Sequence, residues 1–238
     1  MKPKKCDVYM KKKLLSILLP LFLLLPCSLA GQTRVSILGD SYSTFYGHIR
    51  PSTNLSWYGV PDEPKENDVR NVEQTWWSIL TRGDAYRLEV NNSYSGSTIC
   101  CTGYDGADYS DHAFIARTLN LGDPEVIIIF GGTNDSWAKA PVGDDRFSGW
   151  DKRSLYSFRP AFSFLLHSLT RLYPSARLYN VTNTELSTEI TTAMDEICHH
   201  YGVTNIRLHD IDKQWGHPSV AGMESIARQI LSALQADE

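Results

Sequence analysis

Cysteine is scarce in this chain, with five residues among 238. Two of them, Cys6 and Cys27, lie in the first thirty residues, so only Cys100, Cys101 and Cys198 remain for the rest of the chain. Three is an odd number, and the adjacent Cys100 and Cys101 are poorly placed to pair with each other. We therefore expect no disulfide framework and no thiol chemistry, and no role for these thiols follows from the sequence.

An excess of basic residues is also missing. The first thirty residues hold six lysines and one aspartate, and without them 17 basic and 26 acidic residues remain, a formal charge of −9. Such a surface repels phosphate backbones, which argues against nucleic acid as a partner. A Gly-Lys-Ser/Thr phosphate loop is absent as well, which argues against a nucleotide-binding or flavin-binding protein.

The apolar run at Leu14–Leu25 is short for a membrane span and is interrupted by Pro20. Lysines precede it and the small residues Ser28 and Ala30 follow, which is typical of a secretory signal peptide. We predict a signal peptide over residues 1–30, cleavage near Ala30, export to the periplasm or the extracellular space, and no stable membrane association afterwards. Whether Cys27 carries a lipid stays open, although Pro26 fits a lipoprotein cleavage site poorly.

Residues 31–238 are long enough for one domain with its own core. Runs typical of strands alternate with segments of helical periodicity, a pattern that predicts an α/β fold with a parallel sheet covered on both faces. Strands are expected at 34–38, 87–91, 126–130, 177–181 and 206–208, and helices at 72–81, 109–121, 155–173, 187–201 and 219–235. The continuous β-branched run at 126–130 predicts the central strand.

Four stretches with chemical potential follow the predicted strands. Gly39-Asp40-Ser41 ends the first strand and places a hydroxyl in a tight turn, where a serine can act as a nucleophile. Gly96 follows the second strand, Asn134 follows the central one, and His217 lies in the loop after the fifth. Because the carboxyl ends of parallel strands meet at one edge of a sheet, we expect these residues to lie together.

Taken together, these motifs resemble those of the SGNH (GDSL) hydrolase family, and the resemblance covers residues 34–236. It implies a flavodoxin-like three-layer α/β/α sandwich with five parallel strands. It also implies that Ser41 is the nucleophile and His217 the base. The oxyanion would be held by the N–H groups of Ser41 and Gly96 and by the side-chain amide of Asn134.

One position departs from the family pattern. The family usually has an aspartate three residues before the histidine, and here that residue is Gln214. Asp212, five residues before the histidine, is our candidate for the acid that orients His217. A backbone carbonyl or the Gln214 side chain remain alternatives, and either would leave a Ser–His dyad.

Two long loops, 42–71 and 136–152, carry aromatic side chains whose flat faces suit sugar rings. The candidate substrate-binding residues are Tyr46, Trp57, Trp137 and Trp150. With the expected export, they favour a serine esterase that removes small acyl groups, acetyl above all, from carbohydrate. The alternatives are a lipase or thioesterase for longer acyl chains and a non-catalytic glycan-binding protein. The mechanism requires no cofactor and no metal, and the oligomeric state does not follow from the sequence.

Overall fold

Five strands form one parallel sheet in the computed structural model, which describes residues 31–63 and 65–237. The expected signal peptide lies outside these residues. The strands are β1 (Thr33–Gly39), β2 (Tyr86–Ser93), β3 (Val126–Phe130), β4 (Arg177–Thr182) and β5 (Thr204–Arg207). Their order is β2-β1-β3-β4-β5, and every neighbouring pair is parallel. This is the flavodoxin-like strand order.

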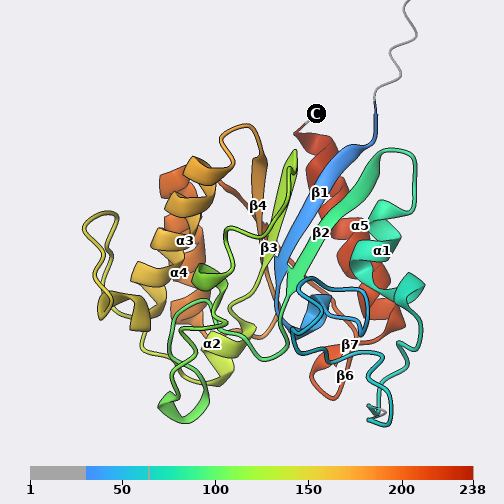
Figure 1. The fold of residues 1–238 in the computed structure, drawn as a ribbon, viewed down its shortest axis with the longest axis horizontal. Helices are drawn as coiled ribbons and strands as arrows, with labels where there is room; N and C mark the ends of the chain where they lie inside the picture. Colours follow the sequence, from blue (N-terminus) through green and yellow to red (C-terminus); the bar gives the residue numbers. More distant parts are fainter. Residues whose placement is uncertain (1–30, 64, 238) are drawn as a thin grey trace, which may run out of the picture. The chain divides into compact units, whose positions relative to one another are not determined.

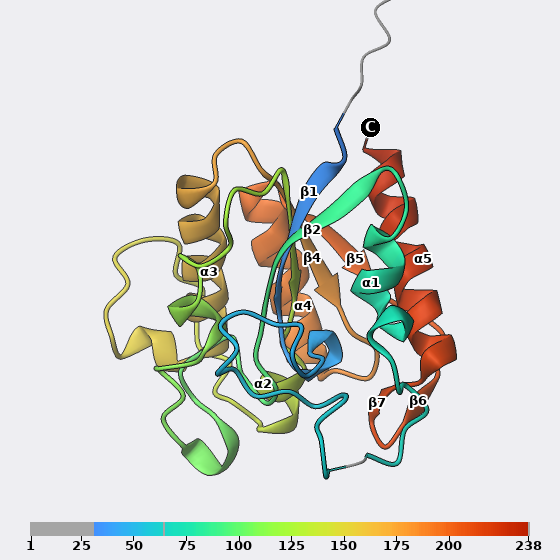
Figure 2. The same cartoon turned by 45° about the vertical axis from the view of Figure 1, so that its right-hand side comes forward.

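Helices cover both faces of the sheet, which confirms the predicted three-layer α/β/α fold (Figure 1). On one face lie α1 (Trp76–Thr81) and α5 (Val220–Ala236), and on the other α3 (Phe158–Leu172) and α4 (Thr188–Tyr201), as the turned view also shows (Figure 2). A short helix, α2 (Thr133–Trp137), follows β3 directly. Single 3₁₀ turns occupy 41–43, 72–74, 104–106, 114–116 and 154–156.

The central strand β3 explains how two apolar layers share one sheet. All five of its residues are buried. Alternate side chains point to opposite faces of a strand, so Ile128 packs in the cluster beneath α1 and α5, whereas Ile127 packs in the cluster beneath α3 and α4. A strand buried on both faces needs the unbroken apolar run that the sequence has here.

The helix predicted over 109–121 is wrong. The structure has turns there and one 3₁₀ turn, Phe114–Ala116. Backbone amides of this segment bond to an earlier part of the chain instead: Tyr109 N–H donates to the Cys101 carbonyl (2.8 Å) and Phe114 N–H to the Thr98 carbonyl (2.9 Å). These long-range bonds use donors that a helical ladder needs, so helical periodicity alone misled the prediction.

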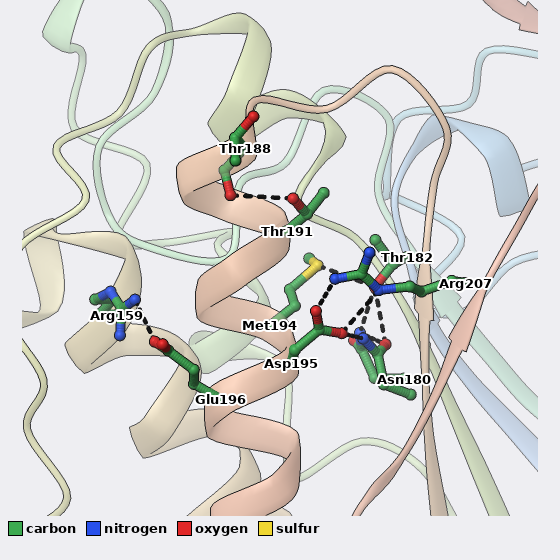
Figure 3. Close-up of polar contacts among 10 residues, drawn as sticks. Arg159, Asn180, Thr182, Thr188, Thr191, Met194, Asp195, Glu196 and Arg207 are labelled. Atoms are coloured by element: carbon green, nitrogen blue, oxygen red, sulfur yellow. Dashed lines mark hydrogen bonds and ion pairs between the residues drawn. The ribbon is translucent and has the colours of Figure 1, made fainter.

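Polar contacts along α4 join it to its neighbours (Figure 3). Asp195 accepts a hydrogen bond from Arg207 Nε of β5 (2.9 Å), and Glu196 accepts one from Arg159 of α3. Exposed ion pairs of this kind contribute little to stability. The buried side chains Ile190, Met194 and Ile197 therefore hold α4 in place. Among the described residues, no helix has the length and apolar character needed to cross a membrane.

Candidate active site

The strand order places a topological switch point between β1 and β3, since the chain continues from β1 to β2 on one side and reaches β3 on the other. Open α/β sheets bind ligands outside the carboxyl ends of the strands at such a point. Ser41 opens the 3₁₀ turn that follows β1, and Asn134 lies in α2, which follows β3. Two of the predicted site residues therefore flank the switch point.

The turn that presents Ser41 is tightly built. Gly39 has no room for a side chain, since an added Cβ would lie 2.5 Å from Ser93 Oγ and 2.7 Å from Ser43 Cβ. Asp40 caps the turn by accepting a hydrogen bond from Tyr42 N–H (3.0 Å). Complete burial raises the pKa of the Asp40 carboxyl to about 7, which is consistent with a structural residue inside the turn.

Ser41 and His217 meet directly, although 176 positions separate them in the chain. Ser41 Oγ lies 2.9 Å from His217 Nε2. The other ring nitrogen, Nδ1, lies 3.2 Å from the Trp215 carbonyl oxygen. A carbonyl only accepts, so Nδ1 carries the hydrogen and Nε2 is free to accept from the Ser41 hydroxyl. This is the tautomer that a general base requires.

The environment keeps the His217 ring neutral. Burial lowers the pKa of His217 to about 4, and the nearby charges of Lys213 and Lys65 act in the same direction. The hydrogen bond to the Trp215 carbonyl opposes them and raises the pKa. An imidazole with this pKa is unprotonated at neutral pH, as a proton acceptor must be.

A tight hairpin brings the Trp215 carbonyl to the ring. Strands β6 (Lys213–Gln214) and β7 (His217–Pro218) are antiparallel, and Gln214 pairs with His217. The two loop residues, Trp215 and Gly216, have φ of 52° and 73°, as two-residue hairpin turns with positive φ require. Tryptophan rarely adopts positive φ, so nothing in the sequence indicated this turn or the role of the Trp215 backbone.

Asp212 does not contact the histidine ring, which corrects the expectation from the sequence. Its carboxylate accepts a hydrogen bond from the hydroxyl of Ser219. Ser219 in turn caps α5, because its Oγ accepts from Gly222 N–H (3.1 Å). Gln214 is also engaged elsewhere, since its Oε1 accepts from Asp68 N–H (2.9 Å). Both side chains are used to fix the hairpin and the start of α5, so the hydrogen bond at His217 Nδ1 is made by the backbone carbonyl of Trp215.

The three predicted oxyanion donors follow three strands: Ser41 follows β1, Gly96 follows β2, and Asn134 lies in α2 after β3. Asn134 Nδ2 donates to the Ser97 carbonyl (3.0 Å), and Asn134 Oδ1 accepts from the Tyr104 hydroxyl (2.8 Å). This pairing leaves the second Nδ2 hydrogen available. Within the described part of the chain, neither Ser41 N–H nor Gly96 N–H donates to another residue. Each of the three predicted donors therefore has an N–H hydrogen that no described residue uses.

Buried polar side chains that the sequence did not indicate fix the loop after β2, which contains Ser97, Ile99 and Cys100. Asp135 accepts from the N–H groups of Ile99 (2.8 Å) and Cys100 (3.1 Å). The buried guanidinium of Arg117 donates to Ser97 Oγ (2.9 Å) and to the Gly39 carbonyl (3.2 Å), and so connects the loop after β2 with the turn after β1. Such side chains have no local sequence signal, because their partners are distant in the chain.

The four aromatic candidates have different positions. The ring of Trp57 stacks on His217, with centroids 3.7 Å apart and planes 5° apart, so one face of Trp57 is covered. Trp137, 42% exposed, lies edge-on to His217 at 6.1 Å. Tyr46 is exposed and has no contact with the Ser41–His217 pair within the described residues. Trp150 packs on Phe164 and His167 instead (5.5 and 4.9 Å), so it is not part of this site.

The three cysteines of the described chain, Cys100, Cys101 and Cys198, are free and buried. Burial raises the pKa of Cys101 to about 11 and that of Cys198 to about 12, and it raises the pKa of Cys100 further. Reactivity follows the thiolate, so these thiols are inert at neutral pH. The group at the sheet edge that can act as a nucleophile is therefore the Ser41 hydroxyl.

The family model for the GDSL-like lipase/acylhydrolase domain matches residues 33–234. Two solved structures assigned as GDSL-like lipases are similar over almost their whole length. The one from Bacteroides uniformis has 64% identity and a TM-score of 0.86, and covers 87% of this chain and 97% of its own. The one from Bacteroides ovatus has 48% identity and a TM-score of 0.84, with 87% and 99% covered.

A family two carbohydrate esterase from Clostridium thermocellum in complex with cellohexaose shares the fold at 19% identity and a TM-score of 0.58, covering 86% of this chain and 64% of its own. No protein with curated annotation matches at a significant level. The family match extends over nearly all of the described chain, and the two Bacteroides structures agree with it. The chain belongs to the GDSL-like lipase/acylhydrolase family and is a hydrolase of the esterase type.

Proposed function

We propose that this protein is an exported serine esterase that removes short acyl groups, acetyl above all, from carbohydrate. The observation that supports it most is the hydrogen bond between Ser41 Oγ and His217 Nε2, with His217 Nδ1 on a backbone carbonyl. Export rests on the predicted signal peptide at residues 1–30. The catalytic unit is a Ser41–His217 dyad whose histidine is oriented by the Trp215 carbonyl.

In the first half of the reaction, Ser41 Oγ attacks the acyl carbon while His217 Nε2 takes the hydroxyl proton. The carbonyl oxygen becomes an oxyanion, which receives hydrogen bonds from Ser41 N–H, Gly96 N–H and Asn134 Nδ2. His217 then returns the proton to the leaving alcohol as the tetrahedral intermediate collapses. The products of this half are the free alcohol and an acyl ester on Ser41.

In the second half, water replaces the alcohol. His217 takes a proton from the water as its oxygen attacks the acyl carbon, and the same donors hold the second oxyanion. Collapse releases the carboxylic acid and returns the proton to Ser41. Asn134 serves both halves, because Tyr104 and Ser97 fix its side chain before substrate arrives.

The surroundings of the dyad support a polar alcohol. The neighbouring pocket beside Trp57 has a partly charged lining that includes Lys65 and Arg70, and neither Ser41 nor His217 lines it. The exposed ring of Trp137 lies 6.1 Å from the His217 ring and can stack on a sugar ring. The likeness to the carbohydrate esterase concerns the fold alone and serves only as a precedent for such substrates.

The test uses nitrophenyl esters from acetyl to octanoyl, together with acetylated oligosaccharides. We expect faster release of nitrophenol from acetyl than from octanoyl esters, and release of acetate from the oligosaccharides. A fluorophosphonate should label the protein once, on the peptide that contains Ser41. Preference for octanoyl would favour the lipase or thioesterase alternative, and neither turnover nor labelling would favour a glycan-binding protein.

We expect Asp212→Asn to keep kcat/KM within about threefold of the unmodified protein, because the Asp212 carboxylate does not touch the base. Loss of a carboxylate that orients the histidine in a triad costs roughly 10⁴-fold in kcat. The measurement is the steady-state rate with nitrophenyl acetate, beside a thermal melt that reports any change at the α5 cap. A fall of more than about 100-fold in a folded variant would show that Asp212 orients His217 as the acid of a triad.

The pKa of His217 predicts an unusually acid-tolerant esterase. Since the base must be neutral, kcat/KM should stay constant down to about pH 5 and fall only around pH 4, where His217 takes up a proton. A histidine at its ordinary pKa would lose activity below about pH 6.5. The pH profile of kcat/KM for the acetyl ester measures this fall at low pH, the acid limb of the profile.

The control for this profile is Lys213→Gln. The Lys213 charge lowers the pKa of His217, so its removal should move the acid limb to higher pH. Circular dichroism at each pH separates loss of the base from unfolding. This check is needed because the unfolded chain binds a proton at histidine above pH 4 while folded His217 does not, so stability falls as the pH drops from about 6.5 to about 4.

A further inference from the structure

The stack of Trp57 on His217 is unusual for a residue in a surface loop. The two rings are almost parallel, with centroids 3.7 Å apart. Trp57 N–H donates to Thr44 Oγ1 (2.9 Å), and Thr44 Oγ1 donates to the Ser41 carbonyl (2.9 Å). Tyr58 packs edge-on against the indole at 4.5 Å. Trp57 is therefore fixed to the nucleophile turn and faces the base, so its position depends on both members of the dyad.

The stack can lower the cost of placing a positive charge on the buried His217 ring. When His217 takes the Ser41 proton, its ring becomes a cation in a buried place. Within the described residues no carboxylate contacts the ring, and Nδ1 has only a neutral carbonyl. The groups facing the ring are Ser41 and Tyr42 from the nucleophile turn, Trp57 and Tyr58 from the long loop, and Trp137 from α2. The nearby charges, Lys213 and Lys65, are both positive.

The face of an aromatic ring carries partial negative charge, and an indole attracts a cation over its face more strongly than the rings of tyrosine or phenylalanine. Trp57 presents that face to His217 in a near-parallel stack at 3.7 Å, whereas Tyr42, Tyr58 and Trp137 lie farther from the ring, at 5.2, 6.2 and 6.1 Å, and are tilted or nearly perpendicular to it. Of these four aromatic rings, Trp57 is thus the nearest to His217 and the one stacked face to face with it, an arrangement that favours an imidazolium over an imidazole.

We propose that Trp57 is a positioning residue of the dyad, whose indole face stabilises the imidazolium of His217 during catalysis and so replaces part of the work of the missing carboxylate. The proposal rests on the proposed esterase function. Because one face of the Trp57 ring is covered by His217, only the other face could stack on a sugar.

The test replaces Trp57 alone, in the full chain, by tryptophan carrying one to three ring fluorines. Fluorine withdraws electron density from the ring face while the shape of the indole is nearly kept. We expect kcat/KM for nitrophenyl acetate to fall stepwise with the number of fluorines, by about tenfold for three. The pKa of His217, followed by NMR titration and assigned with His217→Gln, should fall in the same order. Trp57→Phe should retain more activity than Trp57→Leu.

The matched control is the same fluorine series at Trp77, which is buried in α1 and lies outside the site. There we expect no trend in either measurement. At Trp57, a flat series, or a trend in only one of the two measurements, would overturn the proposal and leave a packing role. The NMR titration requires no turnover, so failure of the esterase function, seen as an inactive unmodified protein, is distinguishable from failure of the stack.

Discussion

Replacement of Ser41 by alanine is expected to lower kcat/KM for acetyl esters by on the order of 10⁴-fold or more. The Ser41 hydroxyl is the group hydrogen-bonded to His217 Nε2, and no acyl-enzyme can form without it. The oxyanion donors remain, so a small residual rate over water is expected rather than none. Initial rates with nitrophenyl acetate measure the loss, and fluorophosphonate labelling should disappear with it.

Ser43→Ala is the matched control for this prediction. Ser43 lies in the same 3₁₀ turn and is equally buried, but its Oγ accepts a hydrogen bond from Trp76 Nε1 (3.2 Å) instead of facing His217. We expect this variant to remain an active esterase with a modest loss of stability, of about 1 kcal/mol. If folded Ser41→Ala kept more than about one hundredth of the parent rate, another nucleophile would have to be sought.

Arg117→Met is expected to lower the free energy of unfolding by about 3–5 kcal/mol. The Arg117 side chain is buried and donates to Ser97 Oγ, to the carbonyl of Gly39 and to that of His112 (3.0 Å). Methionine fills a similar space but donates nothing, so these acceptors would be left buried without their donor. Removing the Arg117 guanidinium also removes the cost of burying its charge. The nearby buried carboxyl of Asp40, however, then loses the positive charge that compensates it.

Urea denaturation, followed by fluorescence and circular dichroism, measures this change. Burial lowers the pKa of Arg117 to about 9, so the guanidinium is still charged at neutral pH, where the comparison is made. Arg117→Lys keeps a positive charge but loses the planar set of donors of the guanidinium. Its free energy of unfolding should lie between those of the parent and of Arg117→Met. The control is Arg171→Met at an exposed position of α3, expected within about 0.5 kcal/mol of the parent. Equal stability of the Arg117→Met and Arg171→Met variants would contradict the prediction.

The predictions for Ser41 and Arg117 concern residues with different roles at one site. Ser41 is the proposed nucleophile, whereas Arg117 holds the turn of Ser41 and the loop of Gly96 in one geometry through Gly39 and Ser97. A fixed arrangement of donors costs no reorganisation when charge develops, which is why buried groups behind an active site influence the rate. We therefore expect the Arg117 variants to lose activity together with stability.

Local signals in the sequence were sufficient for the architecture. The apolar run of 126–130, buried on both faces, and the alternation of strands with helices predicted the parallel sheet, because burial and periodicity depend on neighbouring residues. Helix ends were also readable, as at Ser187, whose side chain accepts from Ile190 N–H at the start of α4. The segment 109–121 failed because its amides bond to residues 98 and 101, outside the helical period.

For the site, the sequence determined which residue types stand at the strand ends, and these brought Ser41, Gly96, Asn134 and His217 to one edge of a parallel sheet. Only the tertiary structure decided how they are supported. The Trp215 carbonyl, the Trp57 stack, Tyr104, Asp135 and Arg117 act through contacts between residues far apart in the chain or through a backbone turn with positive φ. Neither kind of contact has a local pattern in the sequence, so Asp212 was predicted at the position where the Trp215 carbonyl contacts His217 Nδ1.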